Sequence, residues 1–243
     1  MYQLHDYAAA TRVYRQTTLP PVKIVLTGTG RVANGAVQVL RDMNIHQVFP
    51  DEFLYKTSDL AVFTQLACKD YAARKDGQPF HLSDFFKNPG QYKSTFAPFA
   101  HTADIMINGI YWDNRAPAFF TQTEMADPRF HIRVIADVTC DIAPAASIPA
   151  TLRPTTIANP VFGFDPKTGK EIAPFSPHGI DMMTIDNLPN EMPRDASISF
   201  GNQFIEHILP ELLKENSPVI ERATVADRGV LGKHFQYLND YVF

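Results

Sequence analysis

The first residues that could form a ligand-binding site are two glycines and a small residue near the start of the chain. Gly28, Gly30 and Ala33 form the pattern G-x-G-x-x-A. The first glycine permits a tight turn, the second lets the backbone approach an anion, and a small third residue allows close packing. Backbone amides at the start of a following helix would face that anion. The pattern indicates binding of a pyrophosphate, as in NAD or NADP; the alternative is a strand–turn–helix connection without a ligand.

The flanking segments are of the kind that would hold such a turn in place. Lys23–Thr27 is a short apolar run before the glycines, which is typical of a buried parallel strand. After the glycines, apolar residues recur at helical spacing, at Val32, Ala36, Val39, Leu40 and Met43. We therefore expect a strand, a glycine turn and an amphipathic helix.

An acidic residue follows the next apolar segment. His46–Phe49 is expected to form the second strand, and Asp51 comes just after it. Asp51 lies a little over the roughly 20 residues past the glycines at which a carboxylate accepts the ribose hydroxyls of NAD. That role would favour NAD over NADP. The alternative is a helix cap or a loop acid.

Chemistry-bearing residues also follow the later predicted strands, Ala103–Asn108, His131–Asp137 and Ile180–Ile185. Ligands bind at the carboxyl ends of strands in open parallel sheets. Tyr111 and Trp112 could flank a cofactor ring there, although Trp112 is better explained as a cap on the core. Cys140 has no histidine nearby in sequence, so a nucleophilic role is not expected.

The overall composition excludes several classes of function. Of 243 residues, 45% are hydrophobic and 20% are charged, with a net charge of −4, so neither nucleic acid nor an anionic membrane is an expected partner. No apolar run approaches the ~20 residues of a membrane span, and the first residues do not resemble a signal peptide. The two cysteines and eight histidines lack metal-ligand spacing, so no metal site is expected. A cytoplasmic location is expected.

Strands that alternate with helices predict an α/β fold: a Rossmann-type, doubly wound, mainly parallel sheet with C-terminal helices. We expect a linker and short helix over residues 1–20, a dinucleotide-binding domain over 21–195, and C-terminal helices over 196–243. Leu60–Lys75 is expected to be a small hairpin or irregular insertion.

Four blocks in this order resemble a known family: Thr27–Ala36, Ala103–Trp112, Ile135–Asp141 and Ile185–Ala196. They are similar to lysine-forming saccharopine dehydrogenase and to the lysine–2-oxoglutarate reductase domain. Both belong to the alanine dehydrogenase and transhydrogenase superfamily. The resemblance covers about residues 20–243.

The resemblance implies roles for the matching positions. Gly30 and Arg31 would hold the pyrophosphate and adenosine side, and Asp51 the ribose. The substrate would contact Thr139, Cys140 and Asp141. With the glycine turn included, the expected cofactor-binding residues are Gly28, Gly30, Arg31, Val32, Ala33, Asp51, Tyr111, Val138, Ile185, Asp186, Asn187 and Leu188. The cofactor is NAD or NADP; the related reductases use NADPH.

The implied reaction is hydride transfer at the carbon–nitrogen bond of saccharopine, which interconverts it with lysine and 2-oxoglutarate. Family enzymes carry their acid/base lysine and histidine in an N-terminal domain, and only about twenty residues precede the first strand here. We therefore expect an NAD(P)-binding portion, with no catalytic residue of its own, that pairs with an N-terminal catalytic domain and self-associates. The alternative is a non-catalytic NAD(P)-binding or regulatory module.

Overall fold

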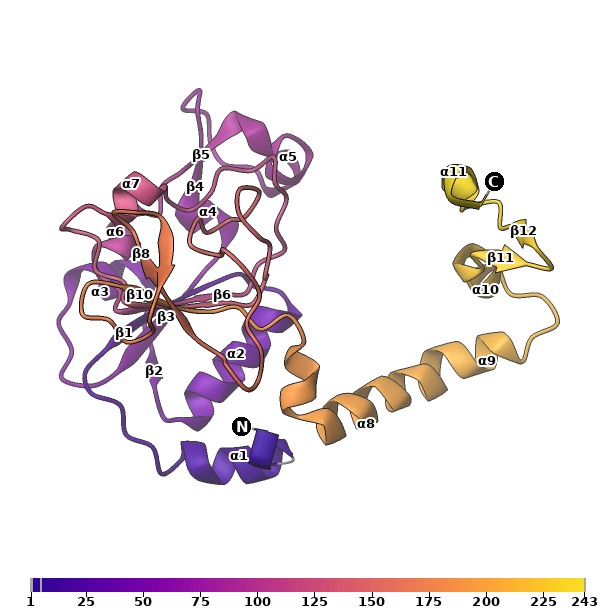
Figure 1. The fold of residues 1–243 in the computed structure, drawn as a ribbon, viewed down its shortest axis with the longest axis horizontal. Coiled ribbons are helices and arrows are strands. Elements are labelled where there is room, and N and C mark those ends of the chain that lie inside the picture. The colour runs from indigo at the N-terminus through magenta and orange to yellow at the C-terminus, as the bar shows by residue number, and fades with distance from the viewer. Residues whose placement is uncertain (1, 5, 243) are drawn as a thin grey trace. The chain divides into compact units, whose positions relative to one another are not determined.

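The structure is a computed structural model that describes residues 2–4 and 6–242 of the chain. It divides into two compact units, Met1–Glu191 and Met192–Phe243 (Figure 1). The candidate site lies in the first unit.

The first unit is built on one eight-stranded sheet with the order β2-β3-β1-β6-β7-β10-β8-β9. The first six strands in that order are parallel, and β8 and β9 add an antiparallel edge. The strands are β1 (Lys23–Thr27), β2 (His46–Gln47), β3 (Val62–Leu66), β6 (Ile105–Asn108), β7 (Val134–Asp137), β8 (Phe162–Asp165), β9 (Lys170–Ile172) and β10 (Ile180–Met183). The predicted α/β fold with a mainly parallel sheet is confirmed.

Alternate residues of β1 face two different cores, as the period of a strand requires. Ile24 and Leu26 pack with one face of α2 (Arg31–Asp42), including its buried residues Val37 and Leu40. Val25 points to the other side and joins a larger aromatic core. That core also contains side chains of α3 (Pro50–Tyr55), α6 (Ala97–Ala100) and α7 (Gln122–Met125). β1 is thus buried on both faces.

A lobe of residues 67–96 lies in the connection between β3 and β6. A two-stranded antiparallel sheet, β4 (Ala72–Arg74) with β5 (Tyr92–Ser94), forms its base. Its helices are α4 (Cys68–Tyr71), α5 (Leu82–Lys87) and the 3₁₀ turn η2 (Pro89–Gln91). Tyr92 stands at its centre, with its ring centroid 5.0 Å from that of Phe85. Outside the lobe, this unit also has η1 (Tyr2–Leu4), α1 (Tyr7–Tyr14) and η3 (Leu188–Glu191).

The segment Leu60–Lys75 differs from the sequence expectation. Leu60–Lys75 is not a hairpin, because Val62–Leu66 is a central strand that pairs with β1 along its whole length. Four of its five residues are buried. The second strand, expected over His46–Phe49, is a two-residue edge strand over His46–Gln47 that pairs only with β3.

The second unit is helical, with a small hairpin. Pro193–Gln203 (α8), a π-helical turn Phe204–Ile208 and α9 (Leu209–Leu212) follow one another without a break. Further elements are α10 (Pro218–Ala223), β11 (Ala226–Asp227), β12 (Val230–Leu231), η5 (Gln236–Leu238) and α11 (Asn239–Val242).

Candidate functional site

The glycine turn is formed by tight packing between three backbone segments. Gly28 follows β1 with a φ of +103°, a conformation that L side chains rarely adopt. A Cβ atom at Gly28 would lie 2.6 Å from the carbonyl oxygen of Gly109, in the loop after β6. A Cβ atom at Gly109 would in turn lie 3.3 Å from the backbone of Ala33 in α2. Small residues at these positions therefore let the turn, the helix and the loop come together.

Gly30 serves a different purpose, because it faces open space. It is the N-cap residue of α2, with extended backbone, and makes no side-chain cap hydrogen bond. A Cβ atom built at Gly30 would meet nothing within 4 Å. The first amides of this twelve-residue helix are thus left open to an external anion. Arg31 and Val32 form the exposed first turn beside them.

A cavity of about 530 Å³ begins at this turn. Its walls come from the glycine turn, from the lobe, and from the loop after β6. The lining residues are Gly28, Thr29, Gly30, Cys68, Tyr71, Ala72, Phe85, Phe86, Pro89, Ser94, Gly109, Ile110, Tyr111, Trp112, Asp113, Ala116, Pro117 and Phe119. A mainly apolar, aromatic hollow beside free helix amides is suited to a flat ring joined to a phosphate.

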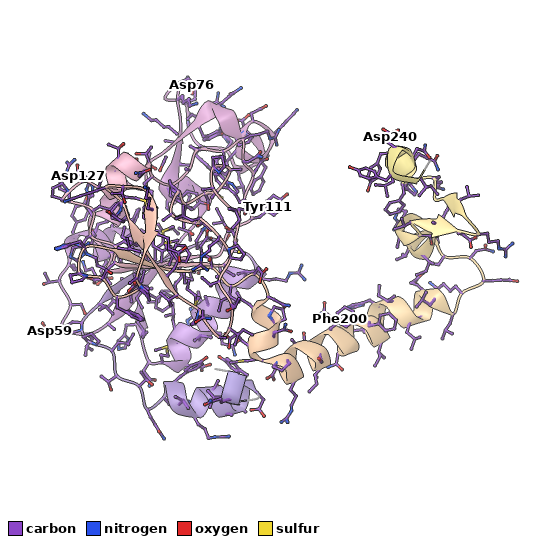
Figure 2. All side chains as sticks on the ribbon, viewed as in Figure 1. Asp59, Asp76, Tyr111, Asp127, Phe200 and Asp240 are labelled. Atoms are coloured by element: carbon purple, nitrogen blue, oxygen red, sulfur yellow. The ribbon has the colours of Figure 1, made fainter. Side chains whose placement is uncertain are left out.

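Two aromatic residues after β6 take part in this cavity. Tyr111 lines it, yet its side chain is 92% exposed, and Figure 2 shows it projecting from the surface of the unit. Trp112 also lines the cavity, and its indole Nε1 donates to the carbonyl of Ala145 at 2.6 Å. Trp112 thus does more than cap the core.

Asp51 does not line the cavity that begins at the glycine turn. It lies in α3, after the edge strand β2, and β3 separates that strand from β1. The Nζ of Lys23, the first residue of β1, donates to the carbonyl of Phe53 in α3 at 2.6 Å. β1 spans five residues, or about 16 Å, and the glycines follow its far end. The chain after α2 thus crosses to the edge of the sheet before it reaches Asp51.

The side chain beside the turn is instead an uncharged amide from β3. The Nε2 of Gln65 donates to the carbonyl of Gly28 at 3.0 Å and to Oδ1 of Asn34 at 3.2 Å. The Gly28 amide donates to the carbonyl of Leu66 at 2.9 Å. Sequence reasoning missed these residues because β3 was assigned to a small hairpin or irregular insertion and not to the central sheet.

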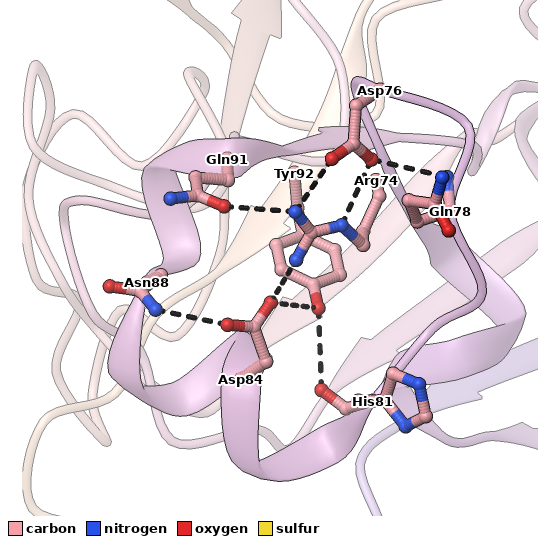
Figure 3. Close-up of polar contacts among 8 residues, drawn as sticks. All are labelled: Arg74, Asp76, Gln78, His81, Asp84, Asn88, Gln91 and Tyr92. Atoms are coloured by element: carbon pink, nitrogen blue, oxygen red, sulfur yellow. Dashed lines mark hydrogen bonds and ion pairs between the residues drawn. The ribbon is translucent and has the colours of Figure 1, made fainter.

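A polar cluster holds the lobe wall of the cavity (Figure 3). The guanidinium of Arg74 donates to both carboxylate oxygens of Asp76, at 2.9 and 2.7 Å, and to Asp84. The hydrogen bond from Arg74 lowers the pKa of Asp76 to about 2. Asp84 also accepts from the hydroxyl of Tyr92 at 2.8 Å. The cluster thereby ties the β4–β5 pair to α5, whose Phe85 and Phe86 line the cavity.

The expected substrate residues Thr139–Asp141, and expected cofactor-binding residues at Val138 and Ile185–Leu188, lie at the ends of two neighbouring strands. Val138–Asp141 follows β7 and Ile185–Leu188 follows β10, and these strands are parallel neighbours. The thiol of Cys140 donates to the carbonyl of Thr184 at 3.1 Å, which joins the two segments. Val138 donates its amide to the carbonyl of Asn108 in the adjacent strand. The structure therefore brings these segments together, two strand spacings (roughly 10 Å) from β1 at β7 and three (roughly 14 Å) at β10.

Negative charge gathers in these segments. Burial raises the pKa of the Cys140 thiol, and the carboxylates of Asp137, Asp186 and Asp141 raise it further. Burial also raises the pKa of Asp141, opposed by a hydrogen bond with Thr139. A protonated amine would compensate this charge.

The described residues form neither a cluster of metal ligands nor a membrane-spanning helix. No group of three or more histidine, cysteine, aspartate or glutamate residues among the described residues is arranged to hold a metal ion. Nor does any described helix have the length and apolar character needed to cross a membrane.

The parallel sheet, the glycine turn and the uncapped start of α2 define an α/β protein of the Rossmann type. No protein-family model matches the chain. It is 27% identical over 252 residues to mitochondrial alpha-aminoadipic semialdehyde synthase of Rattus norvegicus, with 91% of this chain and 27% of that protein covered. The Arabidopsis thaliana synthase is 26% identical, with 90% of this chain and 23% of that protein covered.

A third relative is the NAD(+), L-lysine-forming saccharopine dehydrogenase of Neurospora crassa, which is 27% identical over 205 residues. That match covers 84% of this chain and 44% of the dehydrogenase. The chain is thus a relative of the saccharopine dehydrogenases and alpha-aminoadipic semialdehyde synthases, and the resemblance of the sequence blocks is confirmed. It spans about a quarter of the length of these synthases and less than half of this dehydrogenase.

Proposed function

We propose that this chain is the NAD(P)-binding portion of a saccharopine dehydrogenase-like oxidoreductase. The observation that carries the proposal is the open start of α2, with Gly30 facing empty space beside an aromatic cavity of about 530 Å³. The relatedness to saccharopine dehydrogenases supports it.

The residues present fit a dinucleotide in both shape and charge. The first amides of α2 and the backbone at Gly28–Gly30 would bind the pyrophosphate. The aromatic walls, including Tyr71 and Phe85, would hold a flat base on the lobe side. The opposite end of the cofactor would extend past the end of β6 towards Val138 and Ile185–Leu188. When bound, the nicotinamide supplies the hydride acceptor or donor.

The substrate side is proposed at the ends of β7 and β10. Thr139, Cys140 and Asp141 offer a hydroxyl, a thiol and a carboxylate beside Asp186. These groups would orient an amino-acid substrate through its amino groups, and the reaction would interconvert saccharopine with lysine and 2-oxoglutarate. Their neutral or negative character suits a cationic amine.

Proton transfer is proposed to depend on a further domain. Among the described residues, neither lysine nor histidine lines the cavity. The same observation favours the second candidate function, a non-catalytic NAD(P)-binding or regulatory module. A steady-state assay with saccharopine, or with lysine plus 2-oxoglutarate, distinguishes the two functions when it is run with and without an added catalytic domain from a relative. Turnover by the chain alone at roughly 1 per second or more would show that its own residues transfer the proton.

The cofactor site itself is tested by calorimetry with NAD(H) and NADP(H). We expect binding in the micromolar to millimolar range, and at least about tenfold weaker binding in Gly30→Val, whose side chain would fill the pyrophosphate space. Gly35→Val is the matched control, since Gly35 lies in the same helix and a Cβ atom there also meets open space. Equal affinity of Gly30→Val and the parent would show that the anion does not bind at this turn.

A further inference from the structure

A row of buried polar side chains crosses the sheet beneath the proposed site. Thr27, Asn108 and Asp137 are the last residues of three neighbouring strands, and they pair in register. Thr27 and Asn108 are 0% exposed and Asp137 is 1% exposed. Side chains opposite one another on neighbouring strands share one face of the sheet and interact. The three residues therefore form one cross-strand unit.

Hydrogen bonds connect this row from end to end. The hydroxyl of Thr27 donates to Oδ1 of Asn108 at 2.7 Å, and Nδ2 of Asn108 donates to Oδ1 of Asp137 at 2.9 Å. Nδ2 of Asn108 also donates to the hydroxyl of Ser147 at 2.9 Å. Satisfied networks of this kind fix one arrangement, because an unpaired polar group in the interior is costly.

Asp137 is the residue at which the row meets the substrate-side loop, Val138–Asp141. Its Oδ1 accepts from the backbone amide of Thr139 at 3.2 Å and from the Thr139 hydroxyl at 2.7 Å. Its Oδ2 accepts from the hydroxyl of Thr151 at 2.6 Å. Asp137 thus accepts hydrogen bonds from neutral donors on three different segments of the chain.

The loop that Asp137 holds has an unfavourable backbone conformation. Cys140 has a φ of +53°, which is uncommon for any residue except glycine, asparagine and aspartate. Such a conformation persists only where surrounding contacts impose it. Two contacts do so here: Asp137 binds Thr139 on one side, and Thr184 accepts from the Cys140 thiol on the other.

We propose that Asp137 is a positioning residue, whose buried carboxylate fixes the loop Val138–Asp141 and joins it through Asn108 to the strand that ends in the glycine turn. The assignment of this loop to substrate binding rests on the proposed function. The positioning itself rests only on the contacts above. Asp137 would act through the loop and would not contact the substrate.

The Cys140 thiol reports directly on the loop, and Cys68 provides an internal reference. The chain has only two cysteines, and Cys68 lies in α4, on the lobe. Alkylation of each thiol by N-ethylmaleimide is followed by peptide mass spectrometry in the folded protein. We expect Cys140 in Asp137→Ala to react about tenfold faster than in the parent, relative to Cys68, because the loop opens locally.

Asp137→Asn separates positioning from charge. Loss of the carboxylate alone would lower the pKa of the Cys140 thiol and speed its reaction equally in the alanine and asparagine variants. Asparagine keeps an acceptor oxygen for Thr139 and Asn108, and its amide can donate to the hydroxyl of Thr151. We therefore expect Asp137→Asn to stay within about threefold of the parent rate. Equal acceleration in both variants overturns the proposal.

Two milder variants keep the test valid if Asp137→Ala does not fold. Thr139→Val removes one donor to Asp137 within the loop, and we expect Cys140 to react several times faster. Thr151→Val is the matched control, because it leaves all three hydrogen bonds to Oδ1 in place, and we expect the parent rate. Similar Cys140 rates in Thr139→Val and Thr151→Val overturn the proposal.

A separate binding measurement distinguishes this inference from the proposed function. Saccharopine binding is measured by calorimetry with NAD(H) present, in the parent and in Thr139→Val. Weaker saccharopine binding together with faster Cys140 alkylation supports both proposals. Faster alkylation with unchanged saccharopine binding supports the positioning role and overturns the substrate assignment of the loop.

Discussion

Replacing Gly28 with alanine should destabilise the first unit strongly. The φ of +103° at Gly28 costs an L residue about 1–3 kcal/mol. The new Cβ atom would also lie 2.6 Å from the carbonyl oxygen of Gly109, which cannot retreat freely because Gly109 packs on the backbone of Ala33. Overpacking of this kind costs about 1–3 kcal/mol more. We expect a total loss of roughly 4 kcal/mol in the free energy of unfolding.

Gly35→Ala is the matched control, and it should change stability in the opposite direction. Gly35 lies in the same strand–turn–helix segment, within α2, where a Cβ atom meets nothing within 4 Å. Alanine in a helix is favoured over glycine by about 1 kcal/mol. The two Gly→Ala variants should therefore differ by about 5 kcal/mol.

The assay is urea unfolding followed by circular dichroism, with the parent and both variants under identical conditions. Because Trp112 is the only tryptophan and lies beside the glycine turn, its fluorescence gives a second, local probe of the same transition. A Gly28→Ala variant within about 1 kcal/mol of the parent would refute the close packing of the turn against Gly109.

Three further outcomes follow from the structure. Asp51→Ala should leave the ratio of NAD to NADP affinity within about twofold of the parent in calorimetry, because Asp51 lies away from the cavity; a change of about tenfold would place it at the ribose. Burial and a hydrogen bond to Asp42 raise the pKa of Tyr7 from 10.0 to about 12, so the protonated phenol is favoured by folding. Its stabilising contribution should be complete below pH 10 and lost as the pH rises to about 12. The difference in phenolate absorbance between the parent and Tyr7→Phe gives the midpoint of the Tyr7 titration. A midpoint near pH 10 would contradict the buried contact between Tyr7 and Asp42. Asp84→Asn should weaken cofactor binding several-fold without changing saccharopine binding, because Asp84 holds α5, which forms the lobe wall of the cavity. Unchanged cofactor affinity in calorimetry would contradict the role of Asp84 in holding this wall.

The local sequence determined the central unit of this protein. The run Lys23–Thr27, the glycines and the helical spacing after Val32 correctly predicted β1, the turn and α2. Each of these depends on periodicity and on backbone freedom over a few residues, which a sequence displays directly. The α/β class and the strands before Tyr111, Val138 and Asp186 were predictable for the same reason.

Only the tertiary structure decided which strand lies beside β1. The central position of β3 was not evident from its sequence, because Thr64 and Gln65 interrupt the apolar run of this mostly buried strand. His46–Gln47, which comes next in the chain after α2, pairs only at the edge of the sheet. Strand order depends on crossovers between distant segments, and no local pattern encodes them. For that reason the contact of Gln65 with Gly28 was not predicted.

Tertiary structure also decided the composition of the cavity and of the buried polar row. Phe85 and Phe86 belong to a lobe whose aromatic residues look alike in sequence, and only packing shows which of them line the cavity. Thr27, Asn108 and Asp137 are separated by 81 and 29 residues along the chain. Their hydrogen bonds exist because parallel pairing brings three strand ends into register. The sequence by itself thus determined the glycine turn, and the folded sheet determined which side chains surround it.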